Sequence, residues 1–129
     1  MATLTRTRLE LDPMPRSTAA VEHRSSCPIA RSLDLLGDKW TLLVMRDALI
    51  FGRRTFADFA AGGEHIPTNL LSDRLKRLVG LGLLEKVPYQ NRPPRYEYVP
   101  TAKGEALKPV LRSLRRFGED HLGGQSSQP

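Results

Sequence analysis

Several features that would point to other classes of protein are missing from this chain. It contains a single cysteine, Cys27, which excludes an intrachain disulfide and fits a reducing cytoplasm. It has no run of about 18 apolar residues, the length that a membrane-spanning helix needs. The first 26 residues also have no apolar segment of the signal-peptide kind. We therefore expect a cytoplasmic protein with no membrane contact.

Groups for catalysis and for metal or cofactor binding are also scarce. The three histidines are scattered and, with one cysteine, show no metal-ligand spacing. Asp34, Asp38 and Asp47 fit solvent-facing or capping positions better than paired catalytic carboxylates. The sequence has no phosphate-binding glycine loop and no spacing that supports a Ser–His–Asp arrangement. We expect no enzymatic activity, no bound metal and no cofactor.

The charge that is present is unevenly distributed. The 129 residues suffice for one domain, and they carry a net charge of +6. Residues 53–95 contain eight basic and four acidic side chains, so most of the excess lies there. Such a local excess suits contact with a phosphate backbone, although net charge alone equally fits a basic solvated surface.

Residues 55–80 have the pattern of two short helices separated by a glycine break. Thr55 and Asp58 have the spacing of a capping box at the start of the first helix, and Gly62-Gly63 ends it. The second helix is expected over about 67–80. Leucines at i, i+4 and i+7 mark its buried side: Leu71, Leu75 and Leu78. The side chains left facing outward are polar or charged: Asn69, Ser72, Asp73, Lys76 and Arg77.

Two further helices are expected before this pair. The first begins at Pro28, has Ile29, Leu33 and Leu36 as its inner stripe, and ends at Gly37. Asp38 is expected to cap the second, which covers about 39–50 and is apolar on two sides. Such a helix is buried, and it can line either a ligand pocket or an ordinary core.

A hairpin and a last helix are expected after the pair. Residues 83–87 and 95–99 have strand patterns, and the proline-rich connection 88–94 is expected to project as a loop. Thr101 is expected to cap a long final helix that Pro109 bends. The fold class is thus mainly α (α+β): a winged helix-turn-helix with a two-stranded wing and additional N- and C-terminal helices. Residues 1–26 are expected to form a flexible arm, residues 27–122 the domain, and residues 123–129 a disordered tail.

From Cys27 to about Leu122 the chain resembles the HxlR-type family of bacterial winged helix-turn-helix transcriptional regulators. The motifs that carry the resemblance occur in order at residues 27–29, 36–41, 54–56, 66–76, 82–84, 93–98 and 101–104. The resemblance implies a homodimer that binds double-stranded DNA, with the first and last helices forming the dimer interface. We expect a palindromic operator and, as the commoner outcome, repression.

Nine residues are the candidates for DNA contact. Thr68, Asn69 and Ser72, near the start of the second helix, are placed for bases or nearby phosphates, since Asn pairs with adenine. Lys76 and Arg77 are expected on phosphates, whereas Arg74 has an internal salt bridge as its alternative role. The remaining candidates are basic residues outside this helix: Arg53 and Arg54 for phosphates, and Arg92 and Arg95 for a minor groove or its phosphates.

Alternatives remain for the signal to which the protein responds and for the partner that it binds. Cys27 is the candidate for redox or electrophile sensing, because cysteines at this place do so in several members of the family that the chain resembles, and a helix N-terminus favours the thiolate. The alternative is a small buried residue. A small-molecule effector is a further candidate input. The alternative function is a winged-helix module that binds RNA or a protein partner, since fold does not determine function.

Overall fold

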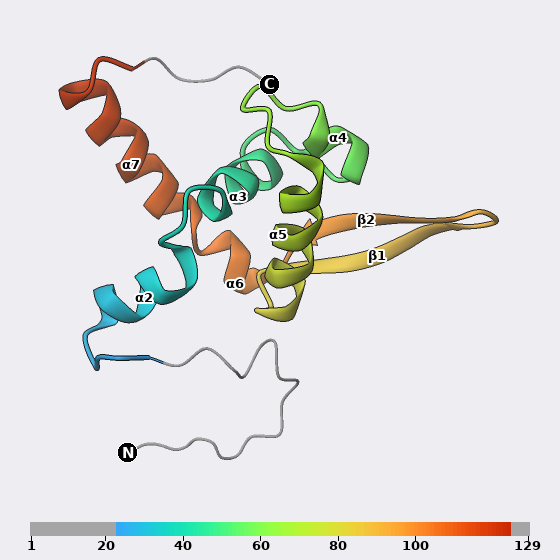
Figure 1. Ribbon diagram of the computed structural model, residues 1–129, viewed down its shortest axis with the longest axis horizontal. Helices are drawn as coiled ribbons and strands as arrows, with labels where there is room; N and C mark the ends of the chain where they lie inside the picture. The colour runs from blue at the N-terminus through green and yellow to red at the C-terminus, as the bar shows by residue number, and fades with distance from the viewer. Residues whose placement is uncertain (1–22, 125–129) are drawn as a thin grey trace. The chain divides into compact units, whose positions relative to one another are not determined.

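The computed structural model describes residues 23–124, so most of the expected N-terminal arm and the C-terminal tail lie outside the described residues. The chain divides into two compact units, one ending at Asp38 and the other beginning at Lys39. The first contains helix α2 (Pro28–Leu36). The second contains the remaining elements in chain order: α3 (Thr41–Leu49), α4 (Phe56–Ala60), α5 (Thr68–Gly80), β1 (Leu84–Asn91), β2 (Pro94–Pro100), α6 (Ala102–Glu105) and α7 (Lys108–His121) (Figure 1).

Helix α2 has the predicted ends but not the predicted burial. Cys27 is its N-cap residue, Pro28 stands in its first turn, and Gly37 is its C-cap residue. Ile29 and Leu33 were expected to face inward, yet they are 73% and 58% exposed. Helical periodicity identifies an apolar face without identifying what covers it, which is why this prediction was wrong for the single chain.

Helix α3 is the centre of the second unit and contacts α4, α5 and α7. Val44, Met45 and Ala48 are buried on it, as the two-sided apolar pattern predicted. The helix begins at Thr41, and Trp40 rather than Asp38 is its N-cap residue. The predicted cap was therefore misplaced, because Lys39 and Trp40 form a turn ahead of the first helical residue.

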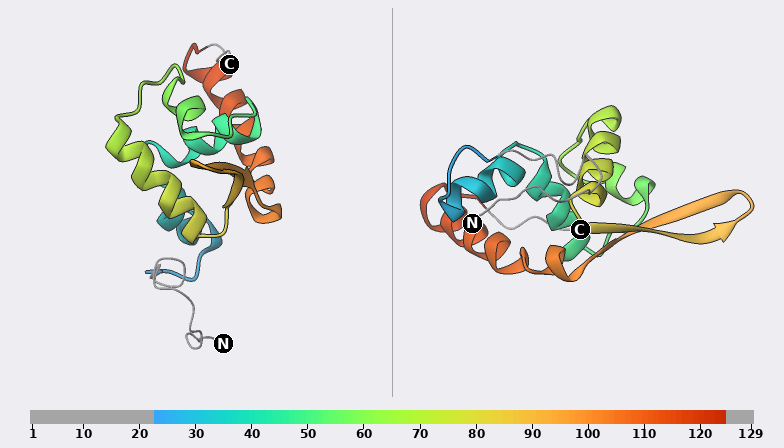
Figure 2. Two further views of the ribbon diagram at one scale, coloured as in Figure 1. Left: turned by 90° about the vertical axis from the view of Figure 1, so that its right-hand side faces the viewer. Right: turned by 90° about the horizontal axis from the view of Figure 1, so that it is seen from below.

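The wing is a continuous antiparallel hairpin that extends away from the helices of its unit (Figures 1 and 2). Its register runs from Leu84 opposite Pro100 to Asn91 opposite Pro94, with an irregularity between Pro88 and Gln90. The predicted long loop over 88–94 is therefore wrong. In a two-stranded ribbon both strands are edges, so a proline that cannot donate a ladder hydrogen bond is tolerated.

The C-terminal segment is two helices where one bent helix was expected. Thr101 caps the short helix α6, its hydroxyl oxygen accepting a hydrogen bond from the Gly104 amide. Pro109 lies in the first turn of α7 rather than inside a longer helix. The chain breaks before this proline because a first-turn position needs no amide donor, whereas an interior position does. Among residues 23–124, no helix is long and apolar enough to cross a membrane.

Candidate nucleic-acid interface

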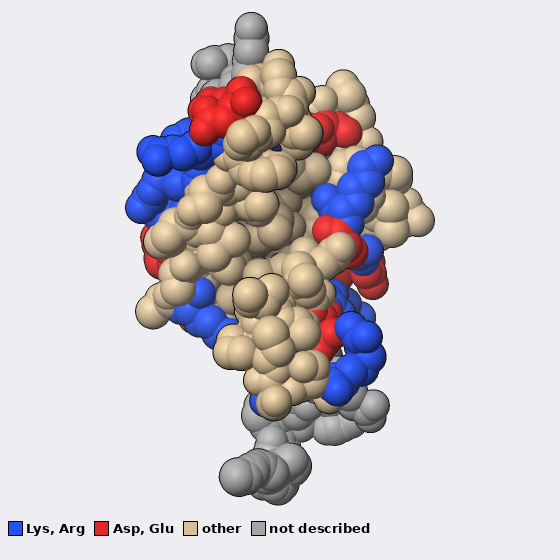
Figure 3. All heavy atoms as spheres, turned by 90° about the vertical axis from the view of Figure 1, so that its left-hand side faces the viewer, with Lys and Arg blue, Asp and Glu red and all other residues tan. Residues whose placement is uncertain are grey.

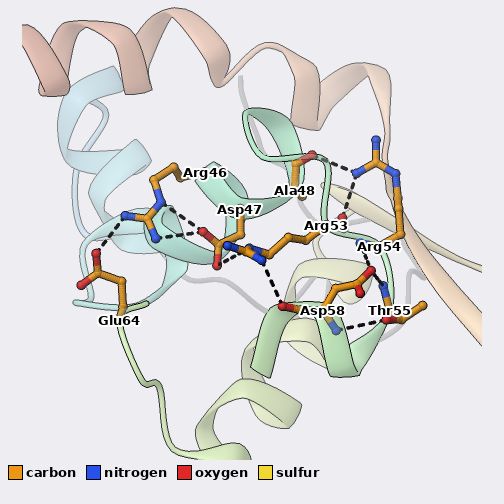
Figure 4. Close-up of polar contacts among 8 residues, drawn as sticks. All are labelled: Arg46, Asp47, Ala48, Arg53, Arg54, Thr55, Asp58 and Glu64. Atoms are coloured by element: carbon orange, nitrogen blue, oxygen red, sulfur yellow. Dashed lines mark hydrogen bonds and ion pairs between the residues drawn. The ribbon is translucent and has the colours of Figure 1, made fainter. Parts of the chain in front are cut away.

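The start of α4 is held by the predicted capping box. The Thr55 side-chain oxygen accepts a hydrogen bond from the Asp58 amide at 3.1 Å, and Asp58 Oδ2 accepts one from the Thr55 amide at 3.1 Å. The amide of Arg54 also donates to Asp58 Oδ2 at 3.2 Å. The hydrogen bond from Thr55, followed by that from Arg54, lowers the pKa of Asp58. The box fixes where the first helix of the pair begins (Figure 4).

The turn between α4 and α5 is tied to α3. Gly62 is buried, and a Cβ there would lie 3.1 Å from Asp47 Oδ2 and 3.2 Å from the Phe59 carbonyl oxygen. His65 takes a left-handed conformation with φ of 56°. Glu64 accepts a hydrogen bond from Arg46 of α3 at 3.0 Å. These contacts restrict how α5 can leave the turn.

Helix α5 has one buried face and one exposed face. Its three buried residues are those of the predicted leucine stripe: Leu71, Leu75 and Leu78. The candidates for base contact are exposed in its first two turns: Thr68, Asn69 and Ser72. Lys76 is exposed one turn further along, and Arg77 is half-buried. Arg74, the residue with two predicted roles, pairs with Asp73 at 2.6 Å.

The tip of the wing carries exposed basic side chains. Arg92 and Arg95 are both exposed, Arg92 in the turn between the strands and Arg95 near the start of β2. The Gln90 side-chain amide donates to the carbonyl oxygens of Arg92 and Pro93 at 3.2 and 3.1 Å, which braces the tip. The hairpin whose tip carries these two residues extends away from the helices of its unit (Figure 1).

Arg53 and Arg54 face inward instead. The Arg53 side chain is 15% exposed, and its Nε lies 3.8 Å from Asp47 Oδ2. Arg54 Nη1 donates to the carbonyl oxygens of Ala48 and Arg53 at 2.9 and 2.8 Å. The structure thus uses both side chains to join α3 to the segment that leads into α4 (Figure 4). It does not expose them as it exposes the polar side chains of α5.

A buried ion-pair network lies where α3 joins the segment that leads into α4, and it was not predicted from the sequence. Asp47, expected at a solvent-facing or capping position, is 7% exposed. Arg46 donates to Asp47 Oδ1 from Nε at 3.1 Å and from Nη2 at 2.8 Å. The expectation was wrong because the burial of Asp47 depends on Arg53 and on the turn at Gly62, both of which lie outside α3. The one available signal was that Asp47 follows Val44 by three residues and so shares its face.

The N-cap residue of α2 is placed as predicted. Cys27 is exposed, so the alternative reading of a small buried residue is wrong. Its amide donates to the Ser25 side-chain oxygen at 3.0 Å. Within residues 23–124, no group of three or more metal-ligating side chains is present.

Comparisons with known proteins match this arrangement. Residues 35–126 match the family model described as HxlR-like helix-turn-helix. The uncharacterized HTH-type transcriptional regulator MT3179 of Mycobacterium tuberculosis is 40% identical over 101 residues, which are 78% of this chain. The chain spans 63% of the length of that relative.

Solved structures show the same fold. The crystal structure of PA1607, a proposed transcription factor, matches with a TM-score of 0.70 at 37% identity, over 82% of this chain and 72% of the other. The redox regulator HypR in its reduced form matches with a TM-score of 0.63 at 28% identity, over 73% of this chain and 92% of the other. These matches support the predicted fold class, a winged helix-turn-helix.

Proposed function

Because the chain belongs to the HxlR-like helix-turn-helix family of transcriptional regulators, we propose that it represses transcription by binding a palindromic operator as a homodimer. The observation that carries this proposal is the division of α5 into a face of buried leucines and an exposed polar face. A helix anchored in this way can enter the major groove with its polar side against the bases.

We assign the DNA contacts according to exposure and position. Thr68, Asn69 and Ser72 lie where a recognition helix meets base edges, and the Asn69 amide can pair with adenine. Lys76 and Arg77, further along α5, neutralise phosphates. Arg92 and Arg95 at the wing tip reach an adjacent minor groove or its phosphates.

Arg53 and Arg54 act differently in this proposal. Their guanidinium groups are engaged with Asp47 and with carbonyl oxygens of the chain. These contacts favour positioning of α4 and of the turn that precedes α5 over the phosphate contact expected from their place in the sequence. Their substitution would then disturb DNA binding through the orientation of the helices.

The dimer is supported by apolar side chains that the single chain leaves exposed. On α7, Val110, Leu114 and Phe117 are 40%, 49% and 56% exposed. Figure 3 shows a face on which residues other than Lys, Arg, Asp and Glu predominate. On α2, Ile29 and Leu33 are exposed as well. Burial of these side chains against a symmetry mate would remove them from water and hold two recognition helices about one DNA turn apart.

Cys27 is a candidate input to this regulator. It is exposed at the N-terminus of α2, and the structurally similar HypR is a redox regulator. We propose that oxidants or electrophiles modify this thiol. Mass spectrometry after mild quinone treatment would show an adduct on the peptide that contains Cys27, and an inert thiol would contradict the proposal.

The alternative partner, RNA or another protein, is less well supported because the exposed side of α5 is polar and basic rather than apolar.

Selection of genomic duplex fragments, followed by anisotropy titrations of the selected sequence, tests the proposed function. We expect specific binding whose log–log salt dependence has a slope of about 0.9 for each phosphate neutralised. Equal affinity for the duplex, an unrelated duplex and an RNA of the same length would contradict it.

A further inference from the structure

A groove between α3 and α7 has been given no ligand above, although Leu114 in its wall is also one of the exposed side chains assigned to the dimer interface. It has a volume of about 310 Å³ and lies wholly within the second unit. Most of its wall is apolar, formed by Leu42, Leu43, Ile50, Phe51, Leu111 and Leu114. A volume of this size is at the lower end of the range for small-molecule sites.

The charged part of the wall is mainly cationic. Two arginines, Arg46 and Arg115, line the groove together with one acidic residue, Glu119. Arg46 is already paired with Asp47 and Glu64. Arg115 is exposed, and the described part of the chain offers it no ion pair. An apolar cavity with an available guanidinium group suits a ligand that has an apolar body and an anionic head, because the carboxylate–guanidinium pair supplies charge-assisted hydrogen bonds.

The groove is connected to the turn before α5 through Arg46. Arg46 Nη1 lies 3.0 Å from Glu64 Oε2 in that turn, and Arg46 Nη2 lies 2.8 Å from Asp47 Oδ1. Its guanidinium carbon also lies 5.2 Å from the centroid of the Phe51 ring, which itself lines the groove. A ligand that packs against Phe51 and places an anion near Arg46 therefore competes with Glu64 for the same guanidinium group.

We propose that this groove binds a small organic carboxylate with an aryl or alkyl body, and that its occupation weakens operator binding. The carboxylate pairs with Arg115 and draws Arg46 away from Glu64, which releases the turn that orients α5. The regulatory half of the proposal, the weakening of operator binding, rests on the proposed function. The binding half, the uptake of the carboxylate by the groove, does not depend on DNA.

Gly118 provides a means of closing the groove without changing its charge. It lines the groove from α7, and a Cβ built on it meets no atom within 4 Å. A larger side chain at this position therefore enters open space, and leucine is a better helix former than glycine. Gly118→Leu fills the groove in a chain that we expect to fold.

Calorimetric titration of the full chain tests the binding half. The probes are phenylacetate, 3-phenylpropanoate and octanoate, each compared with its neutral amide. We expect at least one acid to bind about tenfold or more tightly than its amide, in keeping with a charge-assisted pair. Arg115→Gln should reduce the acid to the affinity of the amide, and Gly118→Leu should abolish binding of both.

The matched control is Arg112→Gln, which removes an exposed arginine from α7 outside the groove and should leave both affinities unchanged. No binding of any acid at millimolar concentration, equal affinity for acid and amide, or equal losses in the Arg112 and Arg115 variants would overturn the proposal. Loss of dimer in sedimentation of Gly118→Leu would also overturn it, because the groove would then be occupied by a second copy of the chain.

Anisotropy titration of the complex with selected operator DNA tests the regulatory half. We expect the bound acid to weaken operator binding severalfold, and Glu64→Gln to keep acid binding while losing most of this effect. An acid that binds without changing operator affinity would overturn the regulatory half. A chain that binds acids but no DNA would refute the proposed function and leave the binding half in place.

Discussion

Arg46 and Glu64, 18 residues apart, form a hydrogen-bonded ion pair of 3.0 Å between the central helix α3 and the turn that leads into α5. The same guanidinium group also holds Asp47, whose side chain is 10% exposed. One arginine therefore serves both the packing of the core and the placement of the recognition helix.

Removal of Glu64 and removal of Arg46 should lower the free energy of unfolding by unequal amounts. Glu64→Gln removes an exposed partner and should cost about 0.2–1 kcal/mol of the free energy of unfolding. Among the described residues, Arg46→Met leaves Asp47 with the more distant Arg53 as its basic partner. This change should cost about 2–4 kcal/mol, since a buried carboxylate loses its principal counter-ion. Urea unfolding measures both, and equal losses would contradict the central role of Arg46.

The capping box should make the free energy of unfolding depend on pH in the acidic range. The folded-state pKa of Asp58 is lowered, so its contribution is present above the unfolded-state value of about 3.9 and is lost as pH falls through the folded-state value. Thr55→Ala should cost about 1 kcal/mol at neutral pH. Asp58→Asn should make unfolding less sensitive to pH between about 5 and 3. Urea midpoints measured across this range check both expectations, and an unchanged acid dependence in Asp58→Asn would contradict them.

These two cases show what a sequence can predict and what it cannot. The Thr55–Asp58 box and the leucines of α5 are local patterns, and the structure confirms both. The burial of Asp47 depends on residues 6 or more positions away in other segments, which periodicity does not report. The strand pairing over residues 88–94 is not evident from the sequence, because proline cannot donate a ladder hydrogen bond; it forms because both strands of a two-stranded ribbon are edges.

Substitutions on α5 should separate specificity from affinity. Asn69→Ala removes a base contact, so it should cost about 1–3 kcal/mol of binding free energy with the preferred operator. It should cost little with an operator that is changed at the base pair that Asn69 contacts. Lys76→Glu should weaken binding to every duplex and lower the salt slope by about 1. Arg112→Glu, exposed on α7, serves as the control for net charge. Titrations against a set of single-base-pair operator variants distinguish these effects, and equal losses with all three substitutions would indicate only a general electrostatic effect.

The wing should contribute affinity without contributing stability. Arg92→Ala combined with Arg95→Ala removes two exposed side chains and should change the free energy of unfolding by no more than about 0.5 kcal/mol. Operator affinity should fall and the salt slope should decrease by up to about 2, if both guanidinium groups neutralise phosphates. Unchanged operator binding in a folded double variant would remove the wing from the interface.

The central claim is that the exposed side of α5 reads a DNA sequence, and competition binding of the purified chain tests it most directly. A labelled operator duplex is titrated at moderate ionic strength in the presence of a polyanion such as heparin, with wild type and Asn69→Ala compared. The account predicts that wild type prefers the operator to the polyanion and to an unrelated duplex, and that Asn69→Ala loses most of the preference between duplexes. Equal displacement by polyanion, unrelated duplex and operator in both proteins would contradict it.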